Sequence, residues 1–123
     1  MNIKQIAIIS VPVVDQDVSK AFYTQTLGFT VTLEAVDGEQ RWVELAPPGS
    51  TTTITLVTWF PQMSPGNLQG LVLDTDNIEQ AYEELKARGV EAEPIEHTQW
   101  AHFVRFKDPD GNGLVFRQKE TAS

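Results

Sequence analysis

The sequence contains no cysteine, and its 123 residues include only two histidines and two methionines. Without cysteine the chain can form neither a disulfide nor a thiolate metal site, and it has no cysteine nucleophile. It also lacks a run of 18 apolar residues, and its start, MNIKQIAIISVPV, has no basic segment followed by an apolar stretch and a cleavage site. We therefore expect neither membrane insertion nor export, and we predict a cytoplasmic protein.

Positive charge is also scarce, because nine Lys and Arg residues stand against 17 Asp and Glu residues, a formal net charge of −8. A negative field of this size repels nucleic-acid phosphates and anionic lipid surfaces, so we expect neither as a partner. The same field favours a cationic ligand, although an acidic surface more often serves only to keep a protein soluble. No GxSxG motif is present, so a serine hydrolase is unsupported.

The composition, 41% hydrophobic and 21% charged, is that of a globular chain with enough apolar material for a core. Its seven prolines and eight glycines are scattered and mark no flexible linker. We therefore predict a single domain over residues 1–123.

The first half of the sequence predicts one strand, one helix and three further strands. The first strand is expected at 6–13, and Asp15 or Asp17 can cap the helix that follows, which Gly28 would end. Three strands are expected at 29–36, 40–46 and 52–59. The stripe of this helix that faces the core is predicted to consist of Val18, Ala21, Phe22 and Leu27.

The second half repeats this order with a different sequence. A strand at 68–75 precedes an amphipathic helix at 78–89, capped by Asp76 or Asn77, and three strands follow in VEAEPIE, FVRFK and LVFRQ. An offset of 60 residues pairs the two helices. The pattern predicts an α+β fold of two βαβββ modules, about 3–60 and 67–118, that form a curved, cup-shaped mixed sheet.

Three motifs carry a resemblance to a known family: FYTQTLGF at 22–29, LDTDNIEQAYEELKARGVE at 73–91, and the turn DPDGN at 108–112. Together they resemble the vicinal oxygen chelate superfamily, which includes glyoxalase I, extradiol dioxygenases, fosfomycin resistance enzymes and bleomycin-binding proteins. The resemblance spans roughly residues 3 to 118. It implies a cup-shaped sheet and usually a homodimer whose cups are built or completed across the subunits.

The resemblance also implies where a metal would be held. Metal enzymes of this superfamily place histidines and glutamates on the first and last strands of each module. Matching the motifs puts these four positions at Ile8, Thr55, Gly70 and Val115. Three of the four have no side-chain lone pair to donate and threonine is a poor ligand, so we predict no metal and no cofactor.

Strand alternation predicts which side chains line the cup. Ile9 should face a helix while Ile8 faces the cup, and Leu114 should face a helix while Val115 and Arg117 face the cup. The predicted floor is small and apolar, which suits an organic ligand better than an ion.

Candidate ligand-binding residues follow from this picture. Three tryptophans can stack on flat or cationic groups, although a tryptophan on a strand more often lies in a core or a dimer interface. Glu44 can supply a negative charge within the cup, and Arg105 and Arg117 can bind an anionic group or pair with acids. The predicted ligand-binding set is Ile8, Trp42, Glu44, Thr55, Trp59, Gly70, Trp100, His102, Val115 and Arg117.

The function predicted from these residues is metal-free binding of a small organic molecule by a homodimer, for sequestration, resistance or sensing. An alternative is a glyoxalase-type lyase or isomerase, or an extradiol dioxygenase-like metalloenzyme, with displaced ligands such as Glu44, His102 and another carboxylate. A metal-free isomerase could use Glu44 or His102 as its general base. An interaction domain without a ligand is the third alternative, and the sequence leaves open whether any catalysis occurs.

Overall fold

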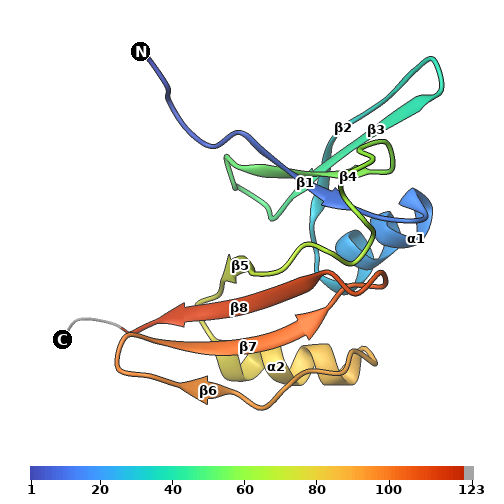
Figure 1. Cartoon of the computed structure of the whole chain (residues 1–123). Helices are drawn as coiled ribbons and strands as arrows, with labels where there is room; N and C mark the ends of the chain where they lie inside the picture. The colour runs from blue at the N-terminus through green and yellow to red at the C-terminus, as the bar shows by residue number, and fades with distance from the viewer. Residues whose placement is uncertain (121–123) are drawn as a thin grey trace.

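The computed structural model describes residues 1–120 and confirms the predicted order of elements (Figure 1). The N-terminal half contains β1 (Ile8–Pro12), α1 (Gln16–Ala21), the π-helical η1 (Phe22–Thr26), β2 (Thr30–Asp37), β3 (Gln40–Ala46) and β4 (Thr53–Val57). The C-terminal half contains β5 (Leu71–Asp74), α2 (Ile78–Ala87), β6 (Glu96–His97), β7 (Ala101–Lys107) and β8 (Gly113–Lys119). None of the helices within these residues is long and apolar enough to cross a membrane.

Each half forms its own four-stranded mixed sheet. The N-terminal sheet has the order β1-β4-β3-β2 and the C-terminal sheet the order β5-β8-β7-β6. In each sheet the first and last strands of the half pair in parallel and the other neighbours are antiparallel. Figure 1 shows the N-terminal sheet above the C-terminal sheet, joined by the long connection between β4 and β5. The α+β class and the two-module architecture are thus as predicted.

The predicted alternation of strand faces holds in both sheets. Val11, Leu56 and Leu114 are buried in a core cluster that draws residues from both halves. Ile8 and Val72, on the opposite faces of their strands, are 42% and 46% exposed. Because alternate residues of a strand point to opposite sides, each sheet keeps one face for the core and leaves the other without a helix.

The predicted inward stripe of the first helix is wrong at Val18, whereas Phe22 and Leu27 pack against the core cluster as expected. Val18 is 52% exposed, whereas Ser19 and Tyr23 are fully buried. Asp15 caps the helix by accepting hydrogen bonds from the backbone N–H groups of Asp17 and Val18. The apolar pattern failed at Val18 because the buried side of this helix also contains the Ser19 hydroxyl and the Tyr23 phenol, which bond to the other half of the chain.

The caps also correct the internal repeat. Asn77 caps α2 as Asp15 caps α1, so the two helices correspond at an offset of 62 residues, from 15 to 77, and not 60. This offset pairs the buried Tyr23 with the buried Leu85. The two helices therefore turn equivalent positions toward the core, one occupied by a phenol and the other by an aliphatic side chain.

The predicted sixth strand, VEAEPIE at 90–96, is also wrong. In the structure β6 contains only Glu96 and His97, and the preceding residues meet β7 through an isolated bridge between Ala92 and Phe106. Pro94 lies in this segment and has no N–H to donate to a ladder. The edge of the C-terminal sheet is short for that reason.

The turn between β7 and β8 joins the two halves. Asp108 is 5% exposed, and its carboxylate accepts the Tyr23 hydroxyl at 2.9 Å, the Asn112 side-chain amide at 2.9 Å and the backbone N–H groups of Asp110 and Asn112. Hydrogen bonds to a carboxylate in a buried place are among the stronger ones, each about 1.5–3 kcal/mol. Burial, followed by the charge of Asp108, raises the pKa of Tyr23 far above its ordinary range, so this phenol stays protonated and remains a donor.

The same turn holds the end of β1 and the start of α1. The Asn112 amide donates to the Pro12 carbonyl at 2.8 Å, and the Asp110 carboxylate accepts from the Val14 N–H at 3.0 Å and the Ser19 hydroxyl at 3.1 Å. DPDGN, chosen from the sequence as a hairpin turn, is therefore also the polar contact that fixes one sheet relative to the other.

Candidate functional site

Two indoles stack beside the face of the N-terminal sheet that carries no helix. Trp42 lies on β3 and Trp59 follows β4; their ring centroids are 6.2 Å apart and their planes 26° apart. Phe60 adds a third ring 6.1 Å from Trp59. We call this side the N-terminal face and define it by Ile8, Ser10, Leu33, Trp42, Glu44 and Thr55.

Glu44 lies in the middle of the N-terminal face. It pairs with Leu33 of β2 on one side and with Thr55 of β4 on the other. Its carboxylate accepts the Trp42 indole N–H at 3.2 Å and the Thr32 hydroxyl at 3.0 Å. Both donors are neutral, and among residues 1–120 Glu44 has no ion pair.

Thr55 forms part of the floor beside Glu44. It is 1% exposed, and its hydroxyl has no hydrogen-bond partner in the described chain. Leaving a buried hydroxyl unpaired costs about 1–3 kcal/mol, so such groups are rare without a reason. The N-terminal face therefore keeps an unused donor and acceptor next to a carboxylate.

The equivalent side of the C-terminal sheet, here the C-terminal face, consists of Val72, Asp74, Phe103, Arg105, Val115 and Arg117. Arg117 donates two hydrogen bonds to Asp74, at 2.7 and 3.0 Å, and Arg105 pairs with Glu96. The Arg117 hydrogen bond lowers the pKa of Asp74 below its ordinary value. Of the two roles considered for these arginines, the structure shows the pairing with acids.

The four positions at which the family resemblance implies metal ligands do not fit a metal. The backbone N–H of Val13 donates to the Val57 carbonyl and that of Thr75 donates to the Arg117 carbonyl, so the β1–β4 and β5–β8 pairs are equivalent. This equivalence superimposes Thr55 on Val115, in agreement with the alignment from sequence. The four side chains, Ile8, Thr55, Gly70 and Val115, contribute a single hydroxyl, which is a poor donor set for any cation.

Among residues 1–120 no group of three or more His, Asp or Glu side chains is arranged to hold a metal ion. Glu44 and His102, considered together as displaced ligands or bases, lie on different sheets. His102 pairs with Gln118, whose side chain caps α2 by accepting from the Ile78 N–H, so His102 belongs to the helix side of its sheet. Its ring instead contacts His97 at 2.7 Å and Glu120 at 2.6 Å.

Trp100 is not brought together with the other tryptophans. It is 78% exposed in the turn between β6 and β7, next to the end of β8, where its carbonyl accepts from the Glu120 N–H. Trp59 follows the end of β4, where Val57 bonds to Val13. The neighbouring Val14 bonds to the DPDGN turn, which lies at the opposite end of the β7–β8 hairpin from Trp100. The predicted binding set therefore divides between two sheets and a distant turn.

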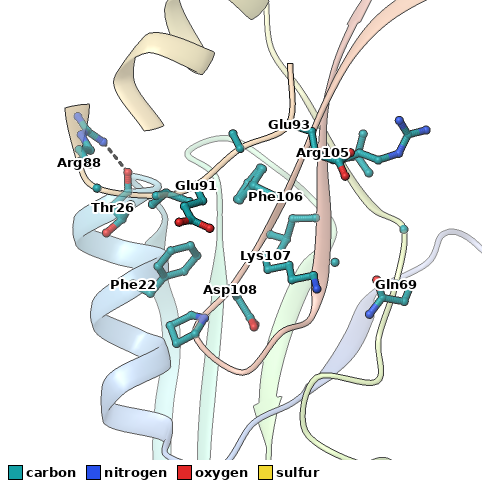
Figure 2. Close-up of a pocket in the computed structure, with 18 residues that line it drawn as sticks. Phe22, Thr26, Gln69, Arg88, Glu91, Glu93, Arg105, Phe106, Lys107 and Asp108 are labelled. Atoms are coloured by element: carbon teal, nitrogen blue, oxygen red, sulfur yellow. Dashed lines mark hydrogen bonds between the residues drawn. The ribbon is translucent and has the colours of Figure 1, made fainter. Parts of the chain in front are cut away.

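A hollow of about 920 Å³ lies elsewhere, between the end of η1, the segment after α2 and β7. It includes Gly70 and Val115 but no tryptophan. Figure 2 shows Phe22 beside Glu91 on one side of β7, while Arg105 and Gln69 lie on the other side. The hollow thus bends around a strand, and its lining includes neither the stacked indoles nor Glu44. We therefore take the N-terminal face, where an aromatic pair and a carboxylate lie together, as the candidate site.

Sequence reasoning missed Thr32 and Phe60. Thr32 lies at an irregularity in the pairing of β2 with β3, between Val31 and Leu33, which lets its hydroxyl reach Glu44. An irregularity of this kind leaves no clear signal in a single sequence. Phe60 follows Trp59 directly, and the aromatic pair at 59–60 was the available signal.

The comparisons with known proteins agree with one another. The sequence profile of the Glyoxalase/Bleomycin resistance protein/Dioxygenase superfamily matches residues 3–116. The chain is 40% identical over 124 residues to the uncharacterized protein YetH of Bacillus subtilis, with 96% of this chain and 99% of YetH covered. It is similar to the crystal structure of TnmS3, an antibiotic binding protein from Streptomyces sp. CB03234, with 39% identity, a TM-score of 0.94 and coverage of 98% and 99%.

A second solved structure, a glyoxalase/bleomycin resistance protein from the same Streptomyces strain, is 40% identical with a TM-score of 0.86. The alignment covers 93% of this chain and 100% of that one. Likeness over nearly the full length of each chain means that both halves of the fold, and the junction between them, are shared.

Proposed function

The chain belongs to the Glyoxalase/Bleomycin resistance protein/Dioxygenase superfamily, and on that premise we propose that it binds a small organic molecule without a catalytic metal. The role would be sequestration, resistance or sensing. The observation that carries the proposal is a pair of stacked indoles beside a half-buried carboxylate on a sheet face that no helix covers. Aromatic faces of this kind bind flat organic rings.

The antibiotic-binding role of TnmS3 supports the same class of function. That protein and this chain share 39% of aligned residues, which is enough to compare the site but not to transfer its ligand. We therefore carry over to this chain only the class of ligand, a small organic molecule, and propose no particular compound.

A homodimer is part of the proposal. Apolar side chains of both helix-free faces are open, with Leu33 at 51% and Val72 at 46% exposed, and every residue of β2 is exposed. A second copy would cover this surface and deepen the shallow N-terminal face into a cup. Sedimentation equilibrium tests this part, and a monomer at all concentrations would contradict it.

Tryptophan fluorescence titration with a panel of aromatic antibiotics tests the binding itself. We expect at least one compound to quench the emission saturably, and Trp42→Ala to weaken that binding by about tenfold or more, since stacking contributes roughly 1–3 kcal/mol per ring. Trp100→Ala is the matched control, because it removes an exposed indole at a distant turn. Unchanged affinity in Trp42→Ala would remove the N-terminal face from the proposal.

A further inference from the structure

We infer that the ligand carries a positive charge and that Glu44 binds it. The inference rests on the proposed function, because it concerns the same face of the N-terminal sheet. It narrows the ligand from any small organic molecule to a flat aromatic cation or an aromatic compound with an ammonium group.

The charge of Glu44 is not neutralised within the described chain. Its two carboxylate oxygens accept hydrogen bonds from an indole and a hydroxyl, and neither group carries a charge. Arg41 of β3 is engaged with Asp17 and Glu34, and Lys20 of α1 is engaged with Glu34. Glu34 pairs with the buried Val43, so it lies on the helix side of the sheet, opposite Glu44.

Three other carboxylates on the sheet strands are paired with cations, whereas Asp37, at the exposed end of β2, has no ion pair among the described residues. Glu34 has two cationic partners, Asp74 has Arg117, and Glu96 has Arg105. A half-buried carboxylate held by neutral donors, with a fixed orientation and no counter-charge, is a preformed acceptor for a cation. The overall charge of −8 adds a long-range attraction for such a ligand.

Thr55 supplies an independent indication that this place receives a polar ligand. Its buried, unpartnered hydroxyl lies on the strand residue that pairs with Glu44. A ligand N–H beside the carboxylate can donate to this hydroxyl as well. The stacked indoles of Trp42 and Trp59 add the third element, since indole faces attract cations more strongly than other aromatic rings do.

The test compares three probes of nearly equal shape by isothermal titration calorimetry at neutral pH: 1-methylquinolinium, quinoline and quinoline-4-carboxylate. We expect 1-methylquinolinium to bind about tenfold or more tightly than quinoline, and the carboxylate to bind most weakly. Glu44→Gln should bring the first two affinities together by weakening the cation and leaving quinoline unchanged. Glu34→Gln is the matched control, because it removes the same charge from the opposite side of the same sheet.

The outcomes separate the inference from the function on which it rests. Equal binding of 1-methylquinolinium and quinoline would overturn the cation inference while supporting an organic-ligand site. Loss of the cation preference in Glu34→Gln to the same extent as in Glu44→Gln would also overturn it, by assigning the effect to net charge. Binding of none of the three probes would overturn both. Thermal unfolding of each variant confirms that Glu44→Gln remains folded.

Discussion

The two halves of the molecule have the same arrangement of strands and differ in how they treat charge. On the C-terminal face the two arginines are each paired with an acid, Arg117 with Asp74 and Arg105 with Glu96. On the N-terminal face Glu44 meets only neutral donors beside two indoles. Paired charges at a surface are satisfied within the chain, whereas an unpaired carboxylate keeps its capacity to bind something else.

In the helices it is the N-terminal half that has a polar group bonded within the chain and the C-terminal half that has none at the equivalent position. Tyr23 and Leu85 occupy equivalent buried positions, but the Tyr23 hydroxyl donates to the buried Asp108 while Leu85 makes apolar contacts only. The polar group of the first half thus ties it to the second. A duplicated architecture has become asymmetric at two places, one that joins the halves and one that faces outward.

The largest expected effect comes from removing the polar difference between the helices. Tyr23→Phe deletes one donor to the buried Asp108 carboxylate and should lower the free energy of unfolding by about 2 kcal/mol. Urea denaturation followed by circular dichroism measures the change. Tyr82→Phe on α2 is the control, since Tyr82 is half-buried and its hydroxyl makes no hydrogen bond among the described residues, and it should change stability little. Equal losses in both variants would contradict the proposed joining role of Tyr23.

A cation supplied from within the chain should make the N-terminal face resemble the C-terminal one. Leu33 is the cross-strand partner of Glu44 and is half exposed, so Leu33→Lys places an ammonium opposite the carboxylate. We expect binding of 1-methylquinolinium to weaken by about tenfold, because the new ion pair competes with the ligand. Calorimetry with Leu33→Gln as the neutral control measures the effect, and equal weakening by both variants would show that Leu33 acts through its shape.

Thr55→Val should separate stability from binding on the N-terminal face. The variant removes a buried hydroxyl that has no partner and keeps nearly the same volume, so we expect stability to rise by about 1 kcal/mol. If the hydroxyl serves a ligand, affinity for a hydrogen-bonding ligand should fall severalfold in the same protein. Denaturation and calorimetry on one preparation check both, and a loss of stability would mean that the hydroxyl is satisfied in solution.

The smallest expected effect is the pH dependence of the Arg117–Asp74 pair. The Arg117 hydrogen bond lowers the pKa of Asp74 in the folded protein. The pair therefore stabilises the fold at pH values above the pKa of Asp74 in the unfolded chain, about 3.9. This contribution is lost as the pH falls through the pKa of Asp74 in the folded protein. Asp74 is more than half exposed, which limits the effect to a few tenths of a kcal/mol. Comparing wild type with Asp74→Asn should show a difference at neutral pH that disappears in acid. A difference that persists in acid would point to packing instead of charge.

The sequence by itself determined the order of elements, the alternation of strand faces and the positions of the turns. These are local properties: period-two apolar residues fix which side of a strand is buried, and Asp, Asn and Gly fix caps and turns. Because motifs and turns are also local, counting residues from them was enough to place Ile8, Thr55, Gly70 and Val115 at equivalent positions of the two sheets. It failed at Val18 and at 90–96, where a distant partner or a proline overrides the apolar pattern.

The tertiary structure alone decided which polar groups meet. Tyr23 and Asp108 are 85 residues apart, Arg117 and Asp74 are 43 apart, and no local pattern shows that the first pair is buried and the second neutralised. Folding also separated Glu44 from His102 and Trp100, and it left Glu44 without a cation beside Trp42. Side-chain charges act through space and over short distances, so their partners are settled only when the sheets take their places.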